Sequence, residues 1–190
     1  MSIPLSSKNW PSLDAAAKRE RLLVAAAAVF SRDGLDASMP VVAAAAGAGV
    51  ASVYRQFSSK YELLAALVIR RLEQIVEAAT EATDRDGDRW AALTEMLRML
   101  VLGQQCDDFM GEAHTAVAEH PGVIEATQRA MLALDGLLDV ARAEGRLRAD
   151  ATTLDIRLLF AATRAAKHVE PEAWQRMLEL LIDAFDAQRG

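Results

Sequence analysis

Apolar residues recur along most of the chain at spacings of three, four and seven positions, a pattern typical of amphipathic α-helices. The alternation of apolar and polar residues that marks β-strands is nearly absent. We therefore predict an all-α protein. The predicted helices span residues 13–32, 39–46, 50–57, 60–83, 89–105, 107–119, 121–144, 152–168 and 171–187.

Capping and turn residues mark the ends of the amino-terminal helices. Ser38 is a favourable residue for the position before the second helix, and the glycines within residues 47–49 break the chain after it. Ser59 followed by Glu62 predicts a capping box at the start of the long fourth helix. The acidic, glycine-containing stretch 84–88 predicts a loop beyond that helix.

Residues 38–60 have the pattern of a helix-turn-helix motif. Two short helices can cross closely only where their contact residues are small, and Ala43 and Ala46 meet that requirement. Gly47 can adopt the backbone conformation that the turn needs. The second short helix, about 12 Å long, fits a DNA major groove about 12 Å wide. The motif therefore predicts that exposed side chains of this helix contact DNA.

The charge of the chain is unevenly distributed. The 190 residues include 21 basic and 27 acidic side chains, and the net charge of −6 alone argues against a nucleic-acid partner. Residues 1–60, however, hold seven basic and four acidic side chains, whereas residues 61–190 hold 14 and 23. This asymmetry is consistent with an amino-terminal part that approaches a polyanion.

Several ordered matches identify the amino-terminal part of the chain with a known family. They are Arg-Glu-Arg-Leu-Leu-Val-Ala-Ala at 19–26, Val29-Phe30, Gly34, Val42-Ala43, Ala46-Gly47, Gly-Val-Ala-Ser-Val-Tyr-Arg-Gln-Phe at 49–57, and Ser59-Lys60 with Leu63 or Leu64. In these positions the chain resembles the amino-terminal domain of the tetracycline-repressor (TetR) family of transcriptional regulators. The resemblance covers roughly residues 13–70.

The resemblance implies a homodimer in which each subunit reads one half of a palindromic double-stranded DNA operator. It further implies a repressor that an apolar or amphipathic small-molecule effector releases from DNA. We expect an amino-terminal three-helix helix-turn-helix DNA-binding domain and a larger carboxy-terminal helical domain for ligand binding and dimerisation. The expected boundaries are a flexible arm at 1–12, the DNA-binding domain at 13–60, a connecting helix at 61–83 and the larger domain at 84–190.

By position in the family motif, seven residues are expected at the DNA. Phosphate contacts, which fix register, are implied for Ser38, Ser52, Tyr54 and Lys60, and base contacts for Val50, Ala51 and Arg55. The family often has glycine at position 51 and threonine at position 52. The alanine methyl can meet a thymine methyl but limits how closely the backbone approaches DNA. Residues 41–45 lack the charged side chains that relatives often expose there.

Two further sets of residues are predicted in the carboxy-terminal part. A ligand pocket should be apolar with a few polar groups, although methionines at helical spacing also form cores. The candidate pocket residues are Met96, Leu97, Leu100, Gln104, Phe109, Met110, His114 and Met131. The last two helices have broad apolar faces that two subunits could combine into a four-helix bundle. The candidate dimer residues are Leu154, Leu158, Ala161, Ala162, Ala165, Trp174, Met177, Leu178, Leu181 and Phe185.

Other function classes find little support in the sequence. We find no phosphate-binding loop, nucleophile elbow or His-Glu-x-x-His motif, so we predict no enzymatic activity, no cofactor and no metal site. The longest apolar run, at 22–30, is too short to span a membrane, and a single cysteine fits a cytoplasmic protein. One alternative is a helical small-molecule-binding protein that has lost specific DNA binding, and a helical enzyme is a second.

Overall fold

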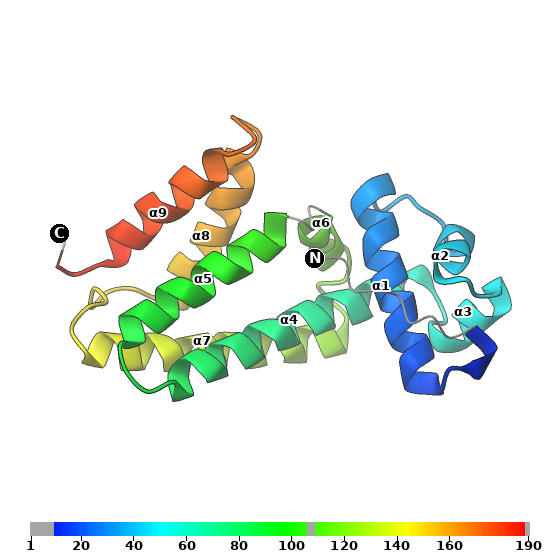
Figure 1. The fold of residues 1–190 in the computed structure, drawn as a ribbon, viewed down its shortest axis with the longest axis horizontal. Coiled ribbons are helices and arrows are strands. Elements are labelled where there is room, and N and C mark those ends of the chain that lie inside the picture. Colours follow the sequence, from blue (N-terminus) through cyan, green and yellow to red (C-terminus); the bar gives the residue numbers. More distant parts are fainter. Residues whose placement is uncertain (1–9, 106–108, 189–190) are drawn as a thin grey trace. The chain divides into compact units, whose positions relative to one another are not determined.

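The computed structural model describes residues 10–105 and 109–188, and these ranges are predominantly helical (Figure 1). The elements are the 3-10 helix η1 (Trp10–Ser12) and the α-helices α1 (Ala15–Asp33), α2 (Met39–Ala46), α3 (Val50–Gln56), α4 (Lys60–Asp84), α5 (Arg89–Gln105), α6 (Met110–Ala116), α7 (Pro121–Ala143), α8 (Thr153–Ala166) and α9 (Ala173–Phe185). The prediction of an all-α fold is confirmed. Within the described residues, the β-type pairing is limited to an isolated bridge between Leu147 and Asp186.

Helix α1 begins and ends at residues suited to those positions. Asp14 caps its start, because the Asp14 carboxylate accepts a hydrogen bond of 2.8 Å from the Ala17 N–H. The helix therefore starts at Ala15 rather than at residue 13. Gly34 ends it with φ of 75°, and the Gly34 N–H donates to the Phe30 carbonyl at 3.0 Å. Residues 10–12 of the predicted flexible arm form η1.

Several carboxy-terminal helices are shorter than predicted, and the helix predicted at 152–168 is α8, Thr153–Ala166. The helix predicted at 107–119 is α6, which ends before Val117, and residues 107 and 108 lie outside the described ranges. The helix predicted at 171–187 is α9, which ends at Phe185. There the backbone pairs with the loop after α7, since the Arg148 N–H donates to the Phe185 carbonyl at 3.0 Å.

The chain divides into two compact units. Unit 1 comprises Met1–Arg70 and Phe109–Val123, and unit 2 comprises Arg71–Asp108 and Ile124–Gly190. Residues 109–123, expected within the larger carboxy-terminal domain, thus belong with the amino-terminal helices. The long helices α4 and α7 each contribute to both units.

Three contacts fix residues 109–123 within unit 1. The ring of Phe109 lies 5.9 Å from that of Phe30 on α1. His120 Nε2 lies 3.4 Å from a carboxylate oxygen of Glu62, and the His120 ring lies 5.6 Å from that of Tyr61. The start of α4 is therefore held between the amino-terminal helices and the turn before α7.

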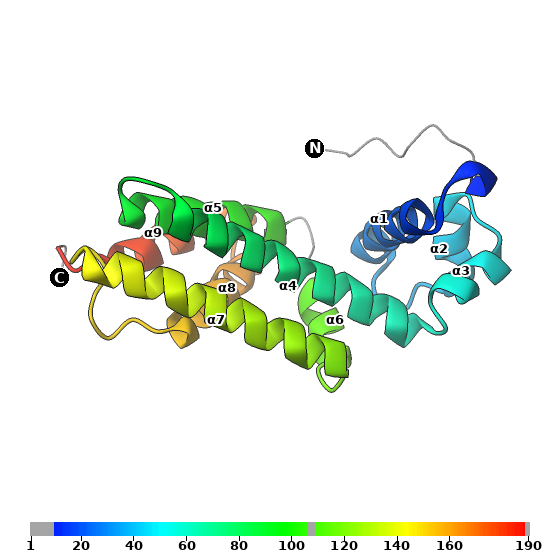
Figure 2. The same cartoon turned by 90° about the horizontal axis from the view of Figure 1, so that it is seen from below.

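Unit 2 encloses an aliphatic core. Leucines of α5 and α7 pack with residues of α8 and α9, and α8 and α9 lie side by side (Figure 1). The fully buried members include Leu97, Leu137, Ile156 and Leu159. Helix α7 runs along α4, where Arg129 lies 3.8 Å from Glu73 (Figure 2). Burial of these leucine and isoleucine side chains supplies about 1.5 to 3 kcal/mol each to the stability of the unit.

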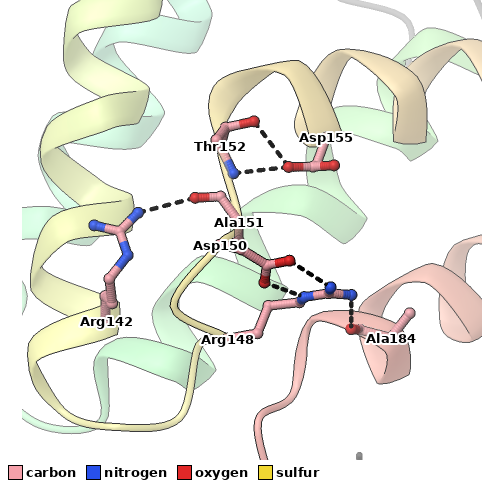
Figure 3. Close-up of polar contacts among 7 residues, drawn as sticks. All are labelled: Arg142, Arg148, Asp150, Ala151, Thr152, Asp155 and Ala184. Atoms are coloured by element: carbon pink, nitrogen blue, oxygen red, sulfur yellow. Dashed lines mark hydrogen bonds and ion pairs between the residues drawn. The ribbon is translucent and has the colours of Figure 1, made fainter.

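Arginine side chains hold the connection between α7 and α8 (Figure 3). The Arg142 guanidinium donates to the Ala151 carbonyl at 2.9 Å. The Arg148 guanidinium donates hydrogen bonds to both carboxylate oxygens of Asp150 at 2.6 and 2.7 Å, and this pairing lowers the pKa of Asp150. The same guanidinium reaches the Ala184 carbonyl of α9 at 3.5 Å. The bond to Ala184 joins the loop to α9, as Figure 3 shows.

The pairing of Arg98 on α5 with Glu179 on α9 predicts a small pH-dependent contribution to stability. Two hydrogen bonds of 2.8 Å from Arg98 lower the pKa of Glu179 below its ordinary value of 4.5. A carboxyl whose pKa is lower in the folded state stabilises the fold above its unfolded-state pKa, and this contribution is lost as the pH falls through the folded-state pKa.

We expect Glu179→Gln to lower the free energy of unfolding at pH 7 by less than about 1 kcal/mol, because both side chains are nearly half exposed. The difference between variant and wild type should vanish at a pH well below 4.5. Urea unfolding at several pH values measures this difference in the free energy of unfolding. Glu170→Gln, at an exposed glutamate, is the control. A difference that persisted at low pH would contradict this assignment.

Candidate nucleic-acid interface

The inner faces of α2 and α3 form the core of a helix-turn-helix. Val42, Ala43 and Ala46 of α2 and Val53 of α3 are fully buried, and α2 packs against α1 and α3 (Figure 1). The two predicted small residues therefore lie in the interior, where close crossing requires them. Phe57, directly after α3, is buried as well and closes this core.

The turn between α2 and α3 depends on glycine. Gly47 has φ of +65° and ψ of 32°, in the left-handed region, and the Ala48 N–H donates to the Ala43 carbonyl at 2.9 Å. A Cβ atom at position 47 would lie 3.3 Å from Nη2 of Arg21. The backbone conformation, more than the lack of space, selects glycine at this position, because the arginine end can move.

Gly47→Ala should therefore lower the free energy of unfolding by about 1 to 2 kcal/mol, the cost of a left-handed conformation for a residue with a Cβ. Gly136→Ala is the matched control, since Gly136 lies inside α7 and an added Cβ meets nothing within 4 Å. The control should stabilise the protein by about 0.5 to 1 kcal/mol. Denaturant unfolding of both variants measures the shifts, and equal shifts in one direction would contradict this explanation.

The outward face of α3 carries most of the predicted DNA-contacting residues. Val50 and Tyr54 are 41% and 48% exposed, and Ala51 and Arg55 are also exposed. Ser52 is half-buried, and its hydroxyl oxygen accepts a hydrogen bond of 2.6 Å from Nη2 of Arg55. Helical periodicity thus places one apolar residue of α3 inward and a mixed apolar and cationic surface outward.

Ser38 and Lys60 flank this surface at the starts of α2 and α4. Ser38 is exposed and its side chain makes no capping hydrogen bond to α2, so the hydroxyl can serve a ligand. Lys60 is half-buried, with Nζ 5.8 Å from the centre of the Phe30 ring. Ser59 caps α4 by accepting from the Glu62 N–H at 3.2 Å, while the Glu62 carboxylate faces His120. Unit 1 therefore holds all seven predicted DNA-binding residues.

Arg19 lies near α3, although it was not among the predicted DNA-contacting residues. Its guanidinium carbon lies 4.4 Å from the centre of the Phe57 ring, and the side chain is exposed. A cation on α1 thus lies over the residue that follows α3. The basic residues at 18–21 were the available signal, although their approach to Phe57 depends on tertiary packing.

The structure distributes the predicted ligand-pocket residues between the two units. Met96, Leu97 and Leu100 are buried in the core of unit 2, and Met131 packs against that core. The other residues are placed elsewhere: Phe109, Met110 and His114 belong to unit 1, and the Gln104 side chain lies outside the described part of the chain. An open depression of about 620 Å³ lies along α4 near Thr80, and its lining includes none of these residues.

The predicted dimer residues differ in exposure. On α8, Leu154 and Leu158 are each 55% exposed, and Ala161 and Ala165 continue this stripe. On α9, by contrast, Leu178 and Phe185 are buried in the core of unit 2. The remaining members are half-buried: Ala162, Trp174, Met177 and Leu181. The exposed stripe of α8 is therefore the part of this set available to a second subunit, and Leu178 and Phe185 cover the core of their own unit.

Among the described residues, no group of three or more His, Cys, Asp or Glu side chains is arranged to hold a metal ion. No helix in the described ranges is long and apolar enough to cross a membrane.

Residues 22–67 match the model of the bacterial regulatory proteins of the tetR family. This segment begins within α1 and includes all of α2 and α3 and the start of α4. No curated protein sequence matches the chain significantly.

Solved structures of similar fold cover most of the chain. A TetR transcription regulatory protein from Mycobacterium vanbaalenii is 27% identical with a TM-score of 0.67, and the match covers 92% of this chain and 98% of that one. The TetR transcriptional regulator SCO0520 from Streptomyces coelicolor is 25% identical with a TM-score of 0.68, covering 88% and 98%. SmeT, the repressor of the Stenotrophomonas maltophilia multidrug efflux pump SmeDEF, is 24% identical with a TM-score of 0.63, covering 88% and 87%.

These likenesses agree with the helix-turn-helix geometry. The family-model match falls on the helices that expose the predicted DNA-contacting residues, and the similar folds extend over the remaining helices. Residues 22–67 thus resemble the amino-terminal part of tetR-family regulatory proteins, and the fold of the chain is similar to that of solved TetR transcriptional regulators.

Proposed function

We propose that this protein is a ligand-responsive repressor that binds a palindromic operator as a homodimer and leaves it when a small-molecule effector binds. The observation that carries the proposal is the outward face of α3, where Val50, Ala51, Tyr54 and Arg55 are exposed on a folded helix-turn-helix. The protein acts by binding rather than by catalysis, and it acts in the cytoplasm.

The dimensions of α3 suit the major groove. Seven residues give a helix about 10 Å long, and the groove is about 12 Å wide. In a dimer, the two copies of α3 would meet successive major grooves about 34 Å apart. Phosphate contacts from Ser38, Ser52, Tyr54 and Lys60 would set the register of each copy on its half-site.

The exposed stripe of α8 supports the dimer. Leu154, Leu158, Ala161 and Ala165 recur every three or four positions, so they share one face of the helix. Two such faces, together with the half-buried residues of α9, would form a four-helix bundle. The small alanines permit close approach of the helices.

An effector need change the DNA affinity only modestly. SmeT, whose fold is similar, has been solved in complex with triclosan, which supports a small-molecule effector for this chain. A coupling free energy of about 1 to 3 kcal/mol between effector and DNA would weaken operator binding roughly 5-fold to 150-fold. We propose that the effector binds within unit 2, near Met96 and Met131.

Selection of binding sites from random duplex DNA tests the proposal. Purified protein, shown to be folded and dimeric, is incubated with the DNA pool at near-physiological salt. Enrichment of a palindrome with half-sites about one helical turn apart is the expected result. No enrichment would overturn the proposal and favour a helical small-molecule-binding protein without specific DNA binding. The uncharged outer surface of α2 is the observation that favours this alternative.

Substitutions at the interface should separate phosphate contacts from base contacts. We expect Lys60→Ala and Tyr54→Ala to weaken binding to all sequences. Loss of the Lys60 charge should also reduce the salt slope of the dimer by about 1.8, or 0.9 per subunit. Arg55→Ala should relax the base preference at one position of each half-site as well. Repeated site selection and salt titration measure these effects, with Lys167→Ala in unit 2 as control. Unchanged selected sequences for Arg55→Ala would contradict its assignment to base reading.

A further inference from the structure

The exposed residues of α2 and of the first two positions of α3 are all apolar. Every exposed residue of α2 lacks a hydrogen-bonding side chain, namely Pro40, Val41, Ala44 and Ala45. Val50 and Ala51 extend this character into α3, and the two valines are 39% and 41% exposed. The surface expected to face DNA therefore consists here of aliphatic side chains, which water solvates less well than polar ones.

The hydrogen-bonding side chains of α3 lie after these two residues. Ser52 and Gln56 are half-buried, whereas Tyr54 and Arg55 are exposed. The Arg55 guanidinium already donates to the Ser52 hydroxyl at 2.6 Å, which holds it beside the helix. Its remaining N–H groups can still bind an acceptor pair such as O6 and N7 of guanine. Polar base reading by α3 is therefore concentrated in its second turn.

The first turn of a recognition helix is the part that contacts base edges most directly. In the major groove, the thymine C5-methyl is the apolar group that distinguishes one base from the others. An aliphatic side chain placed against the amino group of cytosine or adenine would leave that donor without a partner, which is unfavourable. We infer that Val50 and Ala51 read thymine methyl groups, so that each half-site contains at least one thymine selected by its methyl. This inference rests on the proposed function.

The expected effect follows from the burial of a methyl group. Removing one buried methyl contact weakens binding about 3-fold to 4-fold. Because a symmetric dimer contacts both half-sites, loss of the equivalent methyl from each should weaken binding about 10-fold. The salt slope should not change, since no phosphate contact is altered.

Replacing thymine by deoxyuridine in the selected operator tests the inference. Deoxyuridine lacks the C5-methyl and keeps the hydrogen-bonding groups, so it isolates the apolar contact. Each thymine is replaced symmetrically in both half-sites, and the Kd is measured by fluorescence anisotropy at fixed salt. A loss of about 10-fold at one position or more, with an unchanged salt slope, is the supporting result.

Variants of the protein identify the contacting side chain. The deoxyuridine penalty is the ratio of the Kd with deoxyuridine to the Kd with thymine. In Val50→Ala or Ala51→Gly, this ratio should fall toward one at the position read by the altered residue, because the protein no longer contacts that methyl. Val169→Ala, the same change at an exposed valine of unit 2, should keep the full penalty.

The outcomes separate this inference from the proposed function. An operator that binds with equal affinity with and without thymine methyls would overturn the inference and leave operator binding intact. A penalty that stays unchanged in both Val50→Ala and Ala51→Gly would overturn it in the same way. Failure to select any operator would overturn the proposed function and the inference together.

Discussion

Replacing Phe30 by alanine is expected to lower the stability of unit 1 by about 3 to 5 kcal/mol. Phe30 is only 1% exposed, its ring lies 5.9 Å from that of Phe109, and Lys60 Nζ lies 5.8 Å from its centre. Truncation removes the apolar contacts of the ring and leaves a cavity between α1 and residues 109–123. Since a domain is typically stable by about 5 to 15 kcal/mol, this loss is a large fraction of the stability of unit 1.

Hydrogen exchange followed by peptide mass measurement can assign the loss to unit 1. Peptides of α1, α2 and α3 should exchange much faster in Phe30→Ala, and operator binding should fall in parallel. Phe30→Leu is the matched control, because it keeps most of the apolar volume and should cost less than half as much. Exchange in α1 that matched the wild type would show that Phe30 does not hold the unit together.

Capping and turn residues predicted the bounds of the helix-turn-helix closely. Beyond it, tertiary contacts changed the bounds of the helices and of the compact units. Helix α2 spans Met39–Ala46 as predicted, and Gly47 ends it in the left-handed conformation, although the Ser38 side chain makes no capping hydrogen bond at its start. Helix α6 is shorter than predicted, and residues 109–123 belong to unit 1. That placement depends on the packing of Phe109 against a residue 79 positions earlier, which periodicity does not report.

The exposure of the predicted DNA-contacting face follows in part from helical periodicity. With Val53 directed inward, periodicity places residues 51 and 55 on the opposite side of α3, where both are exposed. The exposure of Val50, one turn before Val53, does not follow from periodicity alone. Periodicity could not predict that the Arg55 guanidinium bonds to Ser52, because the choice of rotamer depends on the neighbouring groups. It also could not place Arg19 over Phe57, since that contact joins different helices.

The spacing of apolar residues could not distinguish residues of a ligand pocket from residues of the core. Met96, Leu97 and Leu100 repeat at helical spacing, which both a packed core and an apolar pocket produce. In the structure these residues lie in the core of unit 2, whereas Phe109 and His114 belong to unit 1. Similarly, Leu154 and Leu178 both belong to apolar helix faces, yet only Leu154 is exposed.

The exposed stripe of α8 carries the second prediction with a large effect. Leu158→Glu should dissociate the proposed dimer, because symmetry places two new carboxylates in one interface, where each loses hydration. Leu158 is 55% exposed in the single subunit, so the substitution should leave the fold of unit 2 intact. Sedimentation velocity should show a monomer at micromolar concentration.

Loss of the dimer should reduce operator affinity about 100-fold to 10,000-fold. In a dimer, binding of the first α3 holds the second near its half-site at a high effective concentration, and a monomer lacks this advantage. Leu132→Glu is the matched control, because Leu132 is 71% exposed on α7 and lies outside the proposed interface. The control should stay dimeric and bind the operator as the wild type does. If Leu158→Glu remained dimeric with full affinity, α8 would not form the interface, and another apolar surface would have to join the two subunits.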